Sequence, residues 1–168
     1  MKQQSNIRAV AGLAVKRVLL LCLVGAGVPA GVSGCRTFSL RPPAGYVRYE
    51  RSRQYYRALS PDNSVIVVSS RRNRPKGDLN FWVETLKRDF TSVRGYKFLR
   101  EADVKTADGT QGKSLWFEGS HQGRMYTYQV AIFVAKSRIF SVETATETES
   151  LERHEKAFDA AVSSLKIL

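Results

Sequence analysis

The sequence predicts an α+β fold in which an antiparallel β-sheet packs against helices. Three β-rich runs are separated only by short polar turns, a pattern typical of an antiparallel meander. These runs cover 113–119, 124–135 and 138–144. One apolar stripe at helical spacing follows Asp78, and a second follows Thr146. The chain after the leader is long enough for one hydrophobic core, so we expect a single globular domain over 46–168.

The first 34 residues have the composition of an export signal. A basic segment over 1–17 lacks acidic residues and precedes a continuous apolar run over 18–24, which small residues then follow. This order is that of a secretory signal peptide. The apolar part is also shorter than the roughly 20 residues that a transmembrane helix needs. We therefore assign 1–34 to a signal peptide.

The residues at 32–35, Val-Ser-Gly-Cys, resemble the lipobox of bacterial lipoproteins. The resemblance implies that the Cys35 thiol receives a diacylglycerol and that a signal peptidase cuts before it. The new N-terminus then receives a fatty acid such as palmitate. Two alternatives stay open, namely cleavage after Ala30, which leaves Cys35 as a free thiol, and an uncleaved anchor. The other cysteine, Cys22, leaves with the signal, so no disulfide and no cysteine-based metal site is expected within the mature chain.

The segment 35–45 is predicted to be a lipidated tether, because its prolines and Gly45 disfavour regular structure. Ten residues at ~3.3 Å each reach no more than ~33 Å, which keeps the domain near the bilayer. By resemblance to enteric lipoproteins, Arg36 after the lipid site is no signal for inner-membrane retention. For a Gram-negative host we therefore expect a protein of the cell envelope, on the periplasmic face of the outer membrane.

The net charge limits the class of partner. The chain has 27 Lys and Arg against 15 Asp and Glu, and removal of the four basic leader residues leaves a net charge of +8. A basic balance suits lipid phosphates or an acidic envelope protein. An exported address disfavours nucleic acid. A merely solvated surface explains the same charges equally well.

The first half of the domain reads as strands followed by a helix. Tyrosines and arginines alternate imperfectly over 46–60, which indicates one or two strands, and Pro-Asp-Asn at 61–63 forms a turn. The β-branched run within 64–70 predicts a strand buried on both faces. Asp78 is the expected N-cap of the helix that follows. The apolar stripe of this helix is Leu79, Trp82, Val83, Leu86 and Phe90.

Between this strand and this helix lies a predicted basic loop over 71–77, the sharpest charge feature of the chain. Its cations are Arg71, Arg72, Arg74 and Lys76. They adjoin a helix N-terminus, which itself favours anions. We predict that these four residues form a surface for an anionic partner, with a solvated connection as the alternative.

The second half continues as strands and closes with a helix. A strand over 96–105 precedes an Asp-Gly turn and the meander. Thr146 and Glu149 have the spacing of a capping box for the last helix. The apolar face of that helix is Leu151, His154, Phe158, Ala161, Val162 and Leu165.

No pattern predicts a catalytic, metal or cofactor site. Residues 107–114 match a relaxed phosphate-binding loop, but that loop needs a following helix, and a strand is expected here. His121 lies in a predicted turn and His154 on a helix flank, neither with further ligands at metal spacing. No serine occupies a nucleophile elbow. A catalytic triad assembled only in space stays open.

Several short motifs resemble the PsbP-like α/β proteins, including bacterial lipoproteins of the DcrB-like type. They are Phe-Trp-Val-x-x-Leu at 81–86, Gly109 with Gly-Lys-Ser-Leu-Trp-Phe-Glu-Gly at 112–119, Gly-Arg-x-Tyr-x-Tyr at 123–128, and Phe-x-x-Ala-Val-x-Ser-Leu at 158–165. The resemblance covers roughly residues 46–168. It implies an antiparallel sheet with helices on both faces, an α/β/α sandwich, and an accessory or binding role. No ligand residue is carried over.

Together these features predict a membrane-anchored envelope lipoprotein whose domain is a non-enzymatic binding or scaffold module without a cofactor. Its expected partners are the membrane, through the lipid, and an envelope protein or anionic lipid. The alternative is a hydrolase or small-ligand carrier with a site assembled from distant residues. A deep polar pocket with a convergent serine, histidine and carboxylate favours that alternative, whereas a shallow basic or aromatic face favours the binding module.

Overall fold

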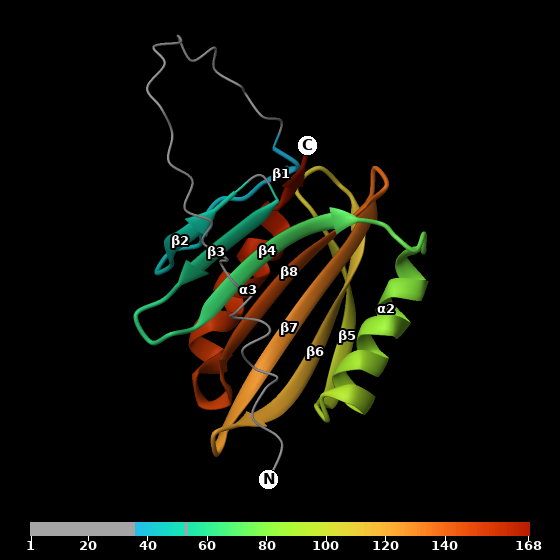
Figure 1. Ribbon diagram of the computed structural model, residues 1–168. Helices are drawn as coiled ribbons and strands as arrows, with labels where there is room; N and C mark the ends of the chain where they lie inside the picture. Colours follow the sequence, from blue (N-terminus) through green and yellow to red (C-terminus); the bar gives the residue numbers. More distant parts are fainter. Residues whose placement is uncertain (1–35, 53) are drawn as a thin grey trace, which may run out of the picture. The chain divides into compact units, whose positions relative to one another are not determined.

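Seven antiparallel strands form the central sheet of the computed structural model, which describes residues 36–52 and 54–168 (Figure 1). The expected signal peptide and Cys35 lie outside these residues. The strand order is β2-β3-β4-β8-β7-β6-β5. Their bounds are β2 (Val47–Arg51), β3 (Tyr55–Leu59), β4 (Val65–Arg72), β5 (Lys97–Lys105), β6 (Gln111–His121), β7 (Arg124–Ala135) and β8 (Arg138–Glu147). The predicted meander is confirmed as β6, β7 and β8.

Helices cover both faces of this sheet, as an α/β/α sandwich requires. α2 (Leu79–Arg88), extended by one π-helical turn, η1 (Asp89–Val93), packs on β6 and β7. α3 (Leu151–Ser164) packs on the opposite face. Both predicted apolar stripes are confirmed, because Trp82, Val83 and Phe90 of the first are buried, as are His154, Phe158, Ala161 and Val162 of the second. Among the described residues, no helix is long and apolar enough to cross a bilayer.

The segment expected to be a tether is instead attached to the domain. Its residues Phe38–Ser39 form β1, which pairs antiparallel with β9 (Lys166–Ile167) at the other end of the chain. Phe38 is only 6% exposed and Ile167 only 4%, and both belong to the core beneath α3. The prediction of a free tether over 36–45 is therefore wrong. Burial of Phe38 and the hydrogen bonds between β1 and β9 stabilise a docked segment, although loop-forming residues follow it.

The predicted capping box at the start of the last helix is also wrong. Thr146 belongs to β8 and its hydroxyl is hydrogen-bonded to that of Ser64, 2.7 Å away. A short 3₁₀ turn, η2 (Thr148–Ser150), separates β8 from α3, and Ser150 takes the N-cap position without a side-chain cap bond. By contrast, the Asp78 carboxylate accepts a bond from the Phe81 amide at 2.8 Å, so the predicted N-cap of α2 is confirmed.

Candidate anion-binding site

The four cations of the predicted basic loop come from two kinds of structure. Arg71 and Arg72 are the last residues of β4 and pair with Ile139 and Arg138 of β8. The prediction that all four belong to a loop is therefore wrong for these two. Only Arg74 and Lys76 lie in the connection to α2, and all four side chains are exposed.

Two further cations reach the same corner from the turn between β7 and β8. Lys136 lies in this turn, and Arg138 begins β8 directly opposite Arg72. Within 36–52 and 54–168, none of these cations forms an ion pair with an acidic side chain. We define the basic corner as Arg71, Arg72, Arg74, Lys76, Lys136 and Arg138. Sequence reasoning missed the last two, because only strand pairing brings them there.

The loop that carries part of the basic corner is held in shape by Asn73. The Asn73 side-chain amide donates to the Gly77 carbonyl at 2.7 Å, and its oxygen accepts from the Gly77 amide at 3.0 Å. The same oxygen accepts from the Trp82 indole nitrogen at 2.8 Å. The Asn73 backbone amide donates to the Ser137 carbonyl at 3.0 Å. One side chain thus ties the loop to α2, while its backbone ties it to the β7–β8 turn.

Two arginines of the corner are held by neighbouring side chains. The Arg71 guanidinium lies over the Trp82 ring, 5.1 Å from its centre, a cation–π contact. The Arg138 guanidinium donates to the hydroxyl and the carbonyl of Ser70 at 2.7 and 3.1 Å. These contacts fix position but neutralise no charge, so both cations keep their attraction for an external anion.

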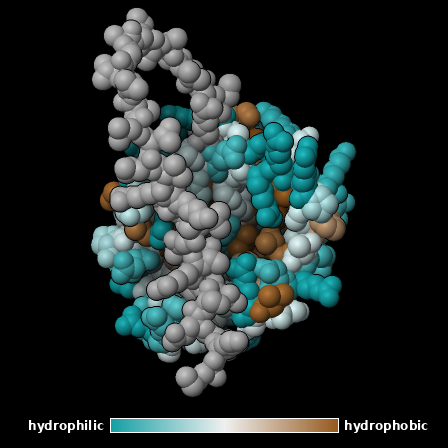
Figure 2. All heavy atoms as spheres, viewed as in Figure 1, coloured by the Kyte–Doolittle hydropathy of each residue, from teal (hydrophilic) through white to brown (hydrophobic). Residues whose placement is uncertain are grey.

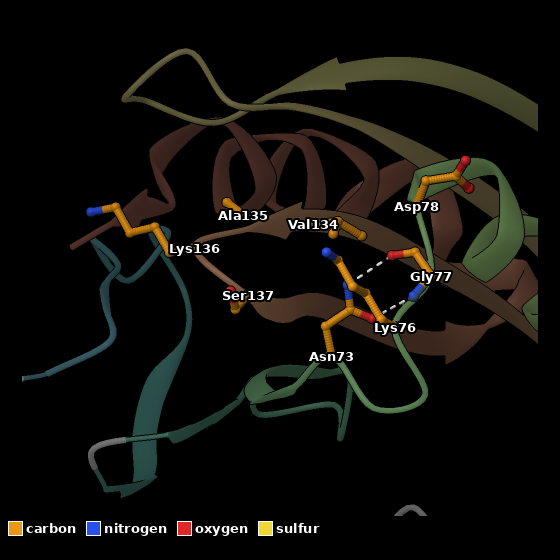
Figure 3. A pocket seen from close by; sticks show the side chains of 8 residues that line it. All are labelled: Asn73, Lys76, Gly77, Asp78, Val134, Ala135, Lys136 and Ser137. Carbon is orange, nitrogen blue, oxygen red and sulfur yellow. Dashed lines mark hydrogen bonds between the residues drawn. The ribbon is translucent and has the colours of Figure 1, made fainter.

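A shallow hollow of about 480 Å³ opens beside the corner. Its lining comes from the 73–78 connection and the end of the β7–β8 hairpin: Asn73, Lys76, Gly77, Asp78, Val134, Ala135, Lys136 and Ser137. Figure 3 shows Asn73 bonded to Gly77 across the loop, while Lys136 extends away from the turn. Long hydrophilic side chains also stand out where β4 leads into α2 (Figure 2). A shallow hollow with cations such as Lys76 and Lys136 in its lining suits a charged partner better than a small apolar ligand.

A second polar constellation lies under the first turns of α3. The His154 ring bonds through Nδ1 to the Tyr46 hydroxyl at 2.7 Å and through Nε2 to the Asp62 carboxylate at 2.8 Å. The Ser60 hydroxyl donates to the other Asp62 oxygen. The bonds from Ser60 and His154 lower the pKa of Asp62 to about 2. His154 is only 8% exposed, so the expectation of a flank position underestimated its burial.

This constellation brings a serine, a histidine and a carboxylate together, but in an order that does not activate a nucleophile. Ser60 bonds to Asp62 rather than to His154, whereas a nucleophilic hydroxyl must bond to its base. The hydroxyl that does meet His154 belongs to Tyr46, which is buried, and burial raises the pKa of Tyr46 to about 12. The arrangement fits a clamp that holds three distant segments together.

The remaining sequence motifs have structural roles. Residues 106–110 form the turn between β5 and β6, with Gly109 at φ 85°, and Gly112 to Ser114 lie in β6. The strand predicted after the phosphate-loop pattern is therefore confirmed, and no helix follows it. Within the part of the chain that the structure describes, no three His, Cys, Asp or Glu side chains gather as metal ligands.

The fold is similar to solved structures of very different sequence. Neither a family model nor a curated protein matches the chain. LpqN of Mycobacterium tuberculosis, described as involved in cell envelope biogenesis, aligns with a TM-score of 0.58 at 14% identity over 82% of this chain and 87% of LpqN. CyanoP, the PsbP of the cyanobacterium Synechocystis, aligns with a TM-score of 0.51 at 12% identity over 85% of this chain and 99% of CyanoP.

A third structure, a mutant of the protein Mog1, aligns with a TM-score of 0.54 at 14% identity over 78% of this chain and 90% of Mog1. At such identities the likeness concerns the fold alone. The predicted α+β class and the PsbP-like arrangement of sheet and helices are thereby confirmed.

Proposed function

We propose that this protein is a lipid-anchored module of the cell envelope that binds an anionic partner through the basic corner and catalyses no reaction. The observation that carries the proposal is the gathering of six exposed or half-exposed cations from β4, the 73–77 loop, the β7–β8 turn and β8. Elsewhere in the domain, several cations pair with acidic residues, as Arg124 does with Glu147 at 2.5 Å. Unpaired charge on a preformed support is what recognition of an anion needs.

We infer the lipid anchor from the lipobox-like residues that end at Cys35. We infer the location in the cell envelope from the same motif. The solved structure of LpqN, a protein described as involved in envelope biogenesis, supports the module by analogy of fold. The proposed location is the outer membrane, because Arg36, the residue after the lipid site, is not a signal for inner-membrane retention.

The alternative function, hydrolysis at a site assembled in space, has its best candidate in the constellation around His154. The hydrogen bonds join Ser60 to Asp62, Asp62 to His154, and His154 to Tyr46. Neither hydroxyl therefore has both the general base and the solvent access that a nucleophile needs. A clamp role therefore explains these residues better, and we do not favour the hydrolase.

The anchor is tested by Cys35→Ser in cells of a bacterial host. We expect the wild type to partition into the detergent phase and to carry three acyl chains by intact mass. The variant should lose both properties and accumulate as uncleaved precursor or as protein released from the membrane. A wild-type mature mass that begins at Gly31 without acyl chains contradicts the proposal.

The basic corner is tested by a variant with four changes, R71Q, R72Q, R74Q and K76Q, which we call the corner variant. The matched control removes four exposed, unpaired cations elsewhere and has the same net charge: R48Q, R88Q, K97Q and K156Q. Retention on heparin, a polyanion, is the readout. The corner variant should elute at lower salt than the control. Elution of both at the same salt would mean that net charge alone attracts anions.

A further inference from the structure

The point at which the domain leaves its expected anchor is fixed by the β1–β9 pair. Phe38 lies opposite Ile167, Ser39 lies opposite Lys166, and the Leu168 amide donates to the Thr37 carbonyl at 3.1 Å. The chain is therefore held from Thr37 onward. Cys35 precedes Phe38 by three residues, which reach ~10 Å at most instead of the ~33 Å of a ten-residue tether.

The β1–β9 pair lies at the same end of the sheet as the basic corner. The β5–β6 turn joins β9 to the sheet, because the Ala107 amide donates to the Leu165 carbonyl at 2.7 Å and Asp108 accepts from the Ile167 amide at 2.9 Å. The β7–β8 turn is next along this edge, since Gly112 of β6 pairs with Phe133 of β7. Figure 1 shows β1, the C-terminus and these turns together at the top.

We call this the anchor end, made of β1, β9, the β5–β6 turn, the β7–β8 turn, the 73–77 loop and the strand ends that flank them. Its exposed or half-exposed cations are Arg36, Arg71, Arg72, Arg74, Lys76, Lys105, Lys136, Arg138 and Lys166. Strands lie about 4.8 Å apart, so the four intervals from β5 to β4 span roughly 20 Å of surface. The nearest acidic residues all have partners. Asp108 in the β5–β6 turn is bonded to the β9 backbone, Asp78 after the loop is bonded as an N-cap, and Asp103 near the end of β5 pairs with Lys113.

We infer that the anchor end lies against the anionic head groups of the leaflet that holds the acylated Cys35, with the strands rising away from the bilayer. This inference rests on the proposed lipid anchor. Because the fixed chain starts within ~10 Å of the anchor, the cations nearest β1 lie little more than one screening length, ~8 Å, from the lipid phosphates. Each such cation strengthens attraction to an anionic surface by about fivefold. The ligand class is therefore the phospholipid head group.

The orientation is tested with fluorophores on two matched positions. Ser137 at the anchor end and Gln122 in the β6–β7 turn are both exposed turn residues with positive φ, 59° and 50°. β7, with its 12 residues, separates them by about 40 Å. S137C and Q122C each supply the one free thiol of a mature chain whose Cys35 is acylated. The acylated proteins are reconstituted in phosphatidylethanolamine vesicles that contain phosphatidylglycerol and a head-group quencher.

We expect the label at position 137 to be quenched several times more strongly than the label at position 122. The difference should shrink on phosphatidylcholine vesicles, in the corner variant, and when salt rises from ~0.15 M to ~1 M, where screening shortens to ~3 Å. The control variant should retain it. Equal quenching at both positions, or quenching that does not depend on the lipid charge, overturns the inference.

Two further outcomes distinguish failure of the proposed orientation from failure of the proposed lipid anchor. Intact mass of the same preparations reports acylation, so a chain without acyl groups defeats the proposed anchor, whereas an acylated chain with equal quenching defeats only the orientation. A 137 label that stays unquenched on anionic vesicles, yet is shielded in native membranes, would assign this end to an acidic protein and overturn the lipid assignment.

Discussion

The two ends of the sheet differ in how their charges are satisfied. At the anchor end, the cations of the basic corner have no carboxylate partner among the described residues. At the far end, formed by the β3–β4 turn, the β6–β7 turn and the start of α3, cations and acids pair. Arg124 meets Glu147 at 2.5 Å, and Arg153 lies 3.8 Å from Asp62. Cations of the far end thus meet acidic side chains, whereas those of the basic corner remain available to a partner.

The comparison also explains why net charge alone is a poor guide. A net charge of +8 spread evenly would give weak attraction everywhere. Here the strand order places cations from 71–76 beside those from 136–138, while acids such as Glu147 and Glu149 follow the opposite ends of strands. The attraction of a surface for an anion therefore depends on which charges the topology brings together.

The largest expected effect concerns the support of the anchor end. Trp82 is 7% exposed, packs in the core under α2, and bonds to Asn73. Trp82→Ala should lower the free energy of unfolding by about 3–5 kcal/mol. Denaturant unfolding followed by circular dichroism measures it. Val93→Ala, at a residue 70% exposed, is the control and should change the value by less than about 0.5 kcal/mol. A Trp82 variant as stable as this control would contradict the burial.

The next effect tests the docking of β1. Phe38→Ala should cost about 3 kcal/mol, at the low end for a buried phenylalanine, because β1 has only two residues. Arg36→Ala, at an exposed neighbour, should cost almost nothing. If both variants unfold at the same denaturant concentration, the segment is a free tether and the anchor end is no longer tied to Cys35.

A smaller effect concerns the far end and depends on pH. The pKa of Asp62, about 2, lies below the roughly 3.9 of an unfolded aspartate, so ionised Asp62 stabilises the fold above pH 4. This contribution is lost as the pH falls from about 4 through about 2. Because the carboxylate is partly exposed, we expect less than about 1 kcal/mol.

The comparison of wild type with Asp62→Asn, by unfolding at pH 6, 4, 3 and 2, measures this loss. The difference in stability should narrow steadily as the pH falls. Glu149→Gln, which changes an exposed acid at the same end that forms no ion pair within the described residues, serves as the control. A difference that stays constant from pH 6 to pH 2 would show that the bonds of Asp62 do not favour its ionised form.

The smallest expected effect tests whether removal of a cation stabilises the anchor end but destabilises the far end. Arg72 and Arg138 face each other across β4 and β8, and like charges in that position destabilise a sheet. Arg72→Gln should raise the free energy of unfolding by a few tenths of a kcal/mol. Arg124→Gln, which breaks the pair with Glu147, should lower it only slightly, because exposed ion pairs contribute little. Changes of the same sign would mean that the two ends are not electrostatically different.

Local patterns predicted most of the fold but little of the site. Both helical stripes, the meander and the Asp78 cap are encoded within a few residues, so periodicity finds them. The pairing of Phe38 with Ile167 is not local, and a segment rich in proline hid it. The predicted start of the loop at Arg71 is wrong for a similar reason. Pairing with β8 extends β4 through two arginines whose composition is typical of a loop.

The clamp around His154 shows the same limit. Tyr46 and His154 are 108 residues apart in the chain, and His154 and Asp62 are 92 apart. The one available signal was a histidine inside an apolar helical stripe, since a buried histidine needs polar partners. That signal indicates that partners exist but does not say which residues they are.

For a chain exported with the proposed lipid anchor, the β1–β9 pair has a consequence for the order of folding and attachment. A chain that crosses a membrane from its N-terminus exposes 36–39 early, whereas 166–167 emerges after every other described element. β1 therefore has no partner during almost the whole passage, so the segment that begins β1 docks on the domain only late. Only when β9 emerges can the pair close. Under the proposed lipid anchor, closure of this pair would be the folding step that brings the cations of the anchor end to the membrane surface.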